Sequence, residues 1–170
     1  MQITPITKPY LKASQQVVAQ AFAQAPHASG DEAQLVARLR QSPSYNADYD
    51  VIALVDEQVV GAAMLSRAMV DRTPIWVLGP LAVLPDHQGQ GIGGALISYL
   101  EVQAGEDERR AISILGDPDY YQRFGYQPAQ DFGITAPMAV EAKYFLIKEL
   151  FPQALHGIAG QLQYDPAFGI

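Results

Sequence analysis

The sequence predicts a mixed α/β protein in which a central mixed sheet carries helices on both faces. Three observations predict this class. Two stretches with helical spacing of apolar residues come first, and β-prone runs joined by short turns then form an antiparallel meander. A strand–helix–strand succession follows, and its crossover makes two neighbouring strands parallel. The chain has 170 residues, which fits one domain spanning residues 1–170.

The first two elements are expected to be helices. The first follows an N-cap at Thr7, ends by Pro26 and repeats apolar residues at helical spacing: Leu11, Val17, Val18, Ala21 and Phe22. The second begins near Asp31 and has three apolar residues on one face, Leu35, Val36 and Leu39. Residues 42–44, Ser-Pro-Ser, end it because they favour a turn.

The meander comes next. Residues 51–55 form a compact β-prone run, residues 56–58 form a hairpin loop, and residues 59–65 form the returning strand. Residues 75–84 form a long apolar run that Gly79-Pro80 interrupts. Proline removes a ladder hydrogen bond, and the flanking residues are too apolar for an exposed edge strand. We therefore expect a bulge in a central strand.

A helix and a buried strand make the crossover. The helix covers residues 92–103 and shows helical periodicity, and the strand covers residues 111–115. Asp117-Pro118 then caps a short helix through about Phe124. Gly125 is placed to end that helix in a left-handed conformation.

The rest of the chain gives weaker signals. Two late strands are expected near residues 131–135 and 143–150, and the tail from Phe151 is rich in loops. No apolar run reaches the roughly 18 residues that a membrane span needs, so no membrane partner is expected. Residues 1–5 show no basic or apolar part of a signal peptide, which favours a cytoplasmic location.

Composition excludes several function classes. The formal net charge of −7 and the scattered basic residues argue against a nucleic-acid partner, because phosphate neutralisation needs clustered Lys and Arg. Cysteine is absent, which excludes disulfides and thiolate metal sites. The three histidines, His27, His87 and His156, are too dispersed to indicate a metal site.

The most informative segment runs from Leu81 to Leu96 and places four glycines where a strand gives way to a helix. Glycine lacks a Cβ atom, so a ligand can approach the backbone closely. The first turn of a helix presents unpaired N–H groups and a partial positive charge. Together these features form an anion site suited to a pyrophosphate, with donors from the backbone rather than from basic side chains.

Three interpretations of this turn compete. In the first, the glycines only let helix and strand pack closely, although so many glycines are unfavourable at a helix start. In the second, Gly89-x-Gly91-x-x-Gly94 marks a dinucleotide fold that binds a nicotinamide cofactor. Its context disagrees, because residues 85–88 separate the strand from the glycines, and Glu106 and Glu108 precede the next strand. In the third, the turn binds an acyl-CoA.

The third interpretation is supported by a resemblance to a known family. The pattern Val83-x-Pro85-x-x-Gln88-x-x-Gly91-x-Gly93 resembles the cofactor motif of the GNAT superfamily of acyl-CoA-dependent N-acetyltransferases. The pattern Tyr121-x-x-x-Gly125-Tyr126 resembles the second family signature. The order of elements is similar across most of the chain, and residues 79–83 and 116–118 resemble a poorly characterised bacterial branch of predicted acetyltransferases. The resemblance implies a GNAT-like, mostly antiparallel sheet of six to seven strands, with strands four and five splayed apart.

The resemblance also implies a cosubstrate, acetyl-CoA, and the residues that bind it. The pantetheine arm would lie between strands four and five, against the backbone of Leu81 and Val83. The pyrophosphate would lie against backbone N–H groups of the glycine-rich turn: Gln88, Gly89, Gln90, Gly91, Ile92, Gly93 and Gly94.

The implied reaction is direct attack of a neutral amine on the thioester carbonyl. The backbone N–H near Leu81 would stabilise the developing oxyanion. Tyr121 would contact the cosubstrate and protonate, or hydrogen-bond to, the departing thiolate. Apart from the resemblance, Tyr121 reads as a packed aromatic beside Phe124 and Tyr126. Tyr120 is expected to pack or to contact the cosubstrate.

Two positions depart from the family pattern. Relatives often place a Glu on strand four, yet residues 75–84 contain no carboxylate, so we assign no general base. Asp117 is one candidate, although its position also suits a helix cap. Many relatives have an Asn seven residues before the tyrosine, and Ile114 stands there. The backbone at Gly116 and Asp117 is expected to bind the cosubstrate instead.

The sequence thus predicts a cytoplasmic N-acetyltransferase that moves an acetyl group from acetyl-CoA to a primary amine of a small molecule or peptide in a ternary complex. The alternative is a non-catalytic acyl-CoA-binding or sensing domain, because the fold alone does not settle function. The expected oligomeric state is a monomer or a homodimer.

Overall fold

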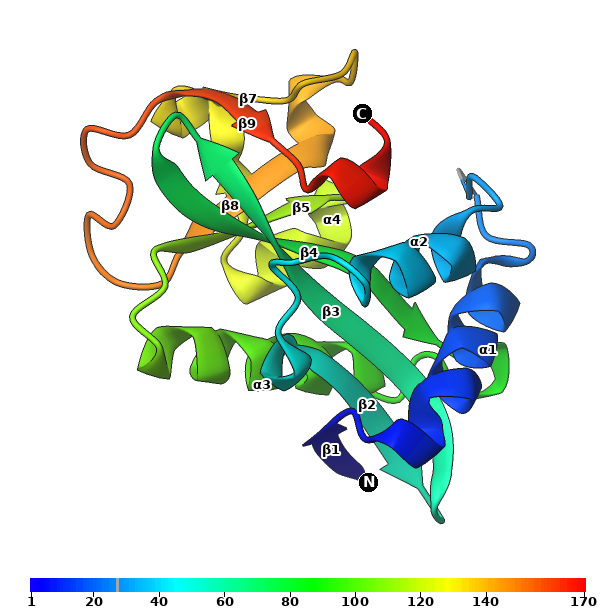
Figure 1. Ribbon diagram of the computed structural model, residues 1–170. Helices are drawn as coiled ribbons and strands as arrows, with labels where there is room; N and C mark the ends of the chain where they lie inside the picture. Colours follow the sequence, from blue (N-terminus) through cyan, green and yellow to red (C-terminus); the bar gives the residue numbers. More distant parts are fainter. Residues whose placement is uncertain (27) are drawn as a thin grey trace. The chain divides into compact units, whose positions relative to one another are not determined.

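The computed structural model describes residues 1–26 and 28–170 (Figure 1). Its contacts divide the chain into two compact units. The first unit comprises Met1–Ser66 and Gly79–Gln103, and the second comprises Arg67–Leu78 and Ala104–Ile170. Two long strands contribute residues to both units.

The first unit contains an antiparallel ladder at the start of the sheet. Strand β1 (Gln2–Pro5) pairs with β2 (Asp50–Val55), and β2 pairs with β3 (Gln58–Val70). The two-residue turn Asp56-Glu57 joins β2 to β3 with both residues at positive φ, 49° and 65°. This conformation matches the twist of a tight hairpin. The predicted hairpin is confirmed, and its second strand runs further than the expected residues 59–65.

Helices cover both faces of β3 within the first unit. Helices α1 (Leu11–Phe22) and α2 (Glu32–Leu39) lie between β1 and β2 in the sequence, and α3 (Ile92–Glu106) follows the fourth strand, β4 (Thr73–Val83). Asp50 lies opposite Met64, and its side chain is bound by Arg40 at the end of α2. Gly61, three residues before Met64, faces α3 instead. Because side chains alternate along a strand, the two sets of helices lie on opposite faces.

The second unit contains the parallel pair that the crossover predicts. Strand β4 (Thr73–Val83) pairs in parallel with β5 (Ala111–Leu115), which pairs antiparallel with β8 (Phe145–Glu149). Strand β8 also pairs with the short β6 (Gln127–Pro128). The hydrogen-bonded path through the chain is β1-β2-β3-β4-β5-β8-β6. These seven strands confirm the predicted mixed, mostly antiparallel sheet.

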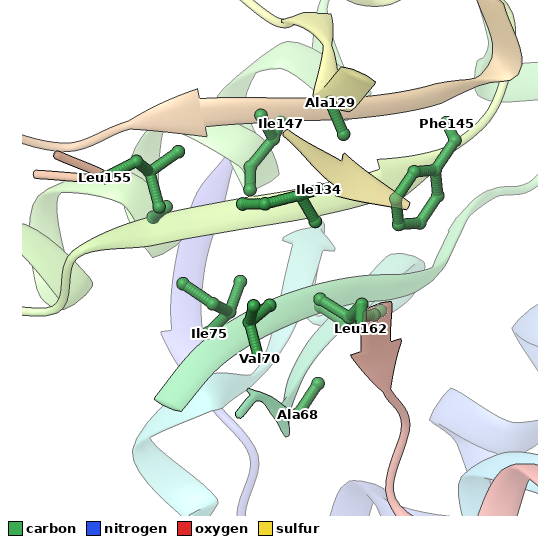
Figure 2. Close-up of a cluster of buried hydrophobic side chains, with 11 residues drawn as sticks. Ala68, Val70, Ile75, Ala129, Ile134, Phe145, Ile147, Leu155 and Leu162 are labelled. Atoms are coloured by element: carbon green, nitrogen blue, oxygen red, sulfur yellow. The ribbon is translucent and has the colours of Figure 1, made fainter. Parts of the chain in front are cut away.

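Two further strands lie off this path. Strand β7 (Ile134–Thr135) pairs in parallel with β9 (Gly160–Gln163), and β9 pairs with the end of β3 at Met69 and Val70. They close a core in the second unit, which Figure 2 shows as side chains gathered between the strands. Its buried members are Ala68, Val70, Ile75, Val77, Ala111, Ala129, Ile134, Phe145, Ile147, Leu155 and Leu162.

Several expected boundaries differ from the structure. The first helix ends at Phe22, four residues before Pro26, and Thr7 precedes a short 3₁₀ turn without a side-chain cap. Most of residues 131–135 is not a strand, because the 3₁₀ helix Ala129–Phe132 ends at the left-handed Gly133. Strands β1, β6 and β9 were not expected. Among the described residues, no helix combines the length and the apolar character that crossing a membrane requires.

Candidate functional site

The sequence-predicted site residues form two clusters, one in each unit. The first cluster contains Leu81 and Val83 on β4 and the turn from Gln88 to Gly94. The second contains Asp117, which follows β5, and Tyr121, the last residue of the short helix α4 (Pro118–Tyr121). His27, one of the dispersed histidines, lies outside the described residues.

The end of β4 presents alternate residues to two environments. Ala82 is buried at 2% exposure, whereas its neighbours Leu81 and Val83 are half-buried. The last residue pair of the parallel ladder is Val77–Ser113, although β4 continues to Val83. The predicted splay of strands four and five requires such an early end to the pairing.

Side-chain amides close the turn that follows β4. Gln88 Nε2 donates to the Val83 carbonyl at 3.0 Å, and Gln90 Nε2 donates to the Asp86 carbonyl at 3.3 Å. The Gln88 N–H donates to the Pro85 carbonyl at 3.3 Å. Gln88 therefore differs from the expectation, because its backbone N–H is already used to shape the turn.

The glycines after Gln88 have the backbone geometry of an anion site. Gly89 and Gly91 have φ angles of +73° and +83°, and a Cβ atom at either position would meet no atom within 4 Å. The Ala95 N–H donates to the Gly91 carbonyl at 3.0 Å, which makes it the first donor within α3. The N–H groups of the preceding first turn have no helical partner for this reason. They can bind an anion, helped by the helix dipole.

The donors of this cluster are backbone groups. Residues 84–103 contain no Lys or Arg, and their one histidine, His87, directly precedes the turn. Phosphate binding by a segment without Lys or Arg is physically reasonable, because several aligned N–H dipoles act on the same anion.

Gly61 is a supporting residue that the sequence analysis missed. A Cβ atom there would lie 3.1 Å from Ile92 Cγ2, 3.1 Å from Leu96 Cδ1 and 3.2 Å from the Ala82 carbonyl oxygen. Gly61 thus lets the first turns of α3 lie directly on β3. The signal was available, since a single glycine inside a strand pattern often marks a close approach.

In the second cluster, Asp117 is the N-cap of α4. Its carboxylate accepts a hydrogen bond from the Asp119 N–H at 2.9 Å, as the helix-cap interpretation requires. The Gly116 N–H donates to the Tyr144 carbonyl at 2.9 Å. The N–H donor of Gly116 is therefore used within the fold. Ile114, in place of the family Asn, is buried.

Tyr121 lies in an aromatic cluster. Its ring centroid is 4.9 Å from that of Tyr120, at a right angle, and 6.0 Å from that of Tyr126. Burial raises the pKa of the Tyr121 phenol above its ordinary value, and Tyr120 adds to the rise. The phenol is therefore fully protonated at neutral pH and can donate a proton or a hydrogen bond. Arg123 stacks on the Tyr120 ring, with Cζ 4.7 Å from its centroid.

The topology disagrees with a dinucleotide fold. A doubly wound fold needs consecutive parallel strands, whereas β1, β2 and β3 are antiparallel neighbours. A short 3₁₀ helix, Pro85–His87, also separates β4 from the glycines.

Comparisons with known proteins point to one family. The "Acetyltransferase (GNAT) domain" family model matches residues 47–128. The chain is 31% identical over 143 residues to the Escherichia coli (strain K12) protein named "Uncharacterized N-acetyltransferase YhbS", and the match covers 82% of this chain and 84% of that protein. It is 32% identical over 122 residues to the protein named "Uncharacterized N-acetyltransferase YjhQ" from the same organism. This match covers 66% of the chain and 65% of the relative, slightly under two thirds of the relative's length.

Solved structures agree with the sequence comparison. The structure of the GNAT family N-acetyltransferase YhbS from Escherichia coli in complex with CoA has a TM-score of 0.89 and 25% identity, and covers 99% of this chain and 92% of that chain. A GNAT family acetyltransferase from Brucella melitensis in complex with acetyl-CoA has a TM-score of 0.79 and 27% identity, and covers 98% and 97% of the two chains. The fold class, the family and the enzyme class predicted from the sequence are confirmed. The chain belongs to the GNAT family of acetyl-CoA-dependent N-acetyltransferases.

Proposed function

We propose that this chain transfers an acetyl group from acetyl-CoA to a primary amine of a small molecule or peptide, by direct attack in a ternary complex. The observation that carries the proposal is the junction of β4 and α3. There, Gly89 and Gly91 in left-handed conformations lead into a helix whose first N–H groups have no helical partner. The CoA and acetyl-CoA complexes of the two structural relatives support the choice of anion.

In this proposal, the turn binds the diphosphate of the cosubstrate. The backbone N–H groups from Gly89 to Gly94 supply the donors, and Gln88 holds the turn in shape through its bond to Val83. The half-buried backbone of Leu81 and Val83 binds the pantetheine arm. The absence of a Cβ atom at Gly91 leaves room for the phosphate oxygens, since an added Cβ atom would meet nothing within 4 Å apart from its chain neighbours.

Bound acetyl-CoA supplies an activated acyl thioester. The Leu81 N–H stabilises negative charge that develops on the carbonyl oxygen. The Tyr121 phenol, whose pKa burial raises, donates its proton to the sulfur as the C–S bond breaks and the C–N bond forms. The amine nitrogen releases a proton to water, and Tyr121 regains one from solvent. We assign no side chain as general base, since no carboxylate lies on β4.

One observation favours a second function. The lack of a carboxylate on β4 suits a non-catalytic domain that binds or senses acyl-CoA. Both functions need the same diphosphate site, so acetyl-CoA binding alone does not distinguish them. Turnover, and its dependence on Tyr121, distinguishes the two functions.

The experiment combines binding with catalysis. Acetyl-CoA binding is measured by calorimetry, and free thiol release is measured with a panel of primary amines and peptides. For an enzyme we expect binding, turnover with some of the amines, and a fall in kcat of about 100-fold in Tyr121→Phe with binding retained. Binding without turnover on any amine would support the sensing domain, and no binding would contradict both functions.

The proposal includes a cytoplasmic location and a monomeric or homodimeric state. A chain without cysteine has no need of an oxidising compartment, and its net charge of −7 does not favour nucleic acid as a partner. Cell fractionation and sedimentation equilibrium test these two points.

A further inference from the structure

The Tyr121 ring lies directly against the backbone of Gly116. A Cβ atom added at Gly116 would lie 2.5 Å from Tyr121 Cε2 and 3.1 Å from Cδ2. Real Cβ atoms essentially never come within 3.0 Å of such an atom. The φ angle of Gly116 lies outside the left-handed region, unlike that of Gly125. Glycine is therefore required here by the ring and not by the backbone conformation.

Neither partner of this contact can move away easily. The Gly116 N–H is tied to the Tyr144 carbonyl at 2.9 Å, which fixes the backbone at the end of β5. The Tyr121 N–H is tied to the Asp117 carbonyl at 3.1 Å. On its other sides, the ring contacts the rings of Tyr120 and Tyr126. A methyl group at position 116 must therefore push the ring into an aromatic cluster that is already packed.

We infer that Gly116 is a positioning residue for the acetyl transfer, because it sets the place of the Tyr121 hydroxyl. The inference rests on the proposed role of Tyr121 as proton donor. The contacted atoms lie along one edge of the ring, towards the hydroxyl, so a shift that relieves the clash carries the hydroxyl with it. Restoring ordinary contact needs a shift of roughly 1 Å, and misplacement on this scale can lower a rate by about 100-fold.

The test is a double-mutant cycle with four proteins: wild type, Gly116→Ala, Tyr121→Phe and the double variant. Phenylalanine keeps the Cδ2 and Cε2 atoms of the ring, so the clash with a new methyl group is the same in both backgrounds. Only the hydroxyl differs. The measurements are kcat with the best amine of the panel, the Kd of acetyl-CoA and the urea midpoint of unfolding.

We expect Gly116→Ala to lower kcat at least tenfold in the Tyr121 background and to leave the residual kcat of Tyr121→Phe unchanged. The urea midpoint should fall by the same amount in both backgrounds, because the methyl group meets the same ring. The matched control is Gly105→Ala on α3, where a Cβ atom meets nothing within 4 Å. Its kcat should equal that of the wild type.

Two outcomes overturn the inference while leaving the proposed function intact. In one, Gly116→Ala leaves kcat unchanged. In the other, it lowers kcat by the same factor in both backgrounds, as a purely structural role requires. If Tyr121→Phe itself leaves kcat unchanged, the proposed role of Tyr121 is wrong, and the inference about Gly116 fails with it.

A second variant covers the case in which Gly116→Ala does not fold. Tyr120→Leu removes the ring that stands at a right angle to Tyr121 and leaves Gly116 in place. Because the Tyr121 ring is then held less tightly, we expect Tyr120→Leu to lower kcat several-fold in the Tyr121 background only. An equal effect in the Tyr121→Phe background would overturn the inference.

Discussion

Arg40 and Asp50 form a bidentate ion pair, with Arg40 Nε 2.8 Å from Oδ2 of Asp50 and Nη2 3.2 Å from Oδ1. Asp50 is 2% exposed, and the Tyr45 hydroxyl donates to its Oδ2 at 2.7 Å. Arg40 also donates to the Ser14 hydroxyl and to the Leu11 carbonyl. The pair therefore joins α1, the end of α2 and the start of β2 within the first unit.

Removal of the Asp50 carboxylate should strongly destabilise the fold. In Asp50→Ala, Arg40 keeps its buried charge without the partner, and we expect a loss of about 3 kcal/mol in the free energy of unfolding. Urea denaturation measures this loss. The control is Asp31→Ala, because the Arg38–Asp31 ion pair is exposed and contributes far less. Equal losses in the two variants would contradict the structural role given to Asp50.

Gly91→Val should separate folding from cosubstrate binding. In the free protein a Cβ atom at this position meets nothing within 4 Å, so we expect the left-handed strain to be the main cost to the fold, about 1 kcal/mol. In the complex it would stand where the diphosphate lies, and we expect the Kd of acetyl-CoA to rise at least tenfold by calorimetry.

Gly157→Val is the matched control for Gly91→Val. Gly157 has a φ of +75° and equally open surroundings, but it lies in the second unit after β8. The Gly157→Val variant should carry the same left-handed strain and bind acetyl-CoA with the Kd of the wild type. Weakened binding in both variants would remove the evidence for a diphosphate site at Gly91.

The pH dependence of kcat should reflect the environment of Tyr121. Burial raises the pKa of this phenol, so it keeps its proton at a pH where an ordinary tyrosine, with a pKa near 10, begins to lose it. We expect no loss of kcat that depends on Tyr121 up to about pH 10. The measurement compares the pH profiles of wild type and Tyr121→Phe. The prediction would be contradicted if the ratio of the wild-type kcat to the Tyr121→Phe kcat already decreased at pH values lower than 9.

Tyr164 should make the fold sensitive to alkaline pH. Burial raises the pKa of Tyr164 from 10.0 to about 12, so the folded state favours the neutral phenol. The contribution of this phenol to the free energy of unfolding is complete below about pH 10, where it is protonated in both the folded and the unfolded state. The contribution is lost as the pH rises towards 12. The expected loss is on the order of 1–2 kcal/mol.

Urea unfolding at pH 8 and pH 11.5 measures this loss. Tyr164→Phe should lose less stability between the two pH values than the wild type. Tyr144→Phe, whose ring is exposed, should lose as much as the wild type. A Tyr164→Phe variant that behaves like Tyr144→Phe would show that Tyr164 is not the titrating group.

Local chemistry determined those parts of the protein that sequence alone could predict. The strand over residues 111–115 and the cap at Asp117 agree with the structure, and so does the left-handed Gly125. The glycine-rich turn before α3 also lies where the sequence placed it. Each depends on residues a few positions apart, whose conformations follow from backbone sterics and helix-end hydrogen bonding.

Only the tertiary structure decided features that depend on a distant partner. The strands β1 and β9 have four residues each and exist because β2, β3 and β7 pair with them. Such short strands have too few residues to show a period of their own. The sequence shows that positions 61 and 116 are glycines, but it does not show which atoms each glycine packs against. Whether a glycine frees the backbone or makes room for a helix or a ring is settled by atoms that the fold brings from elsewhere in the chain.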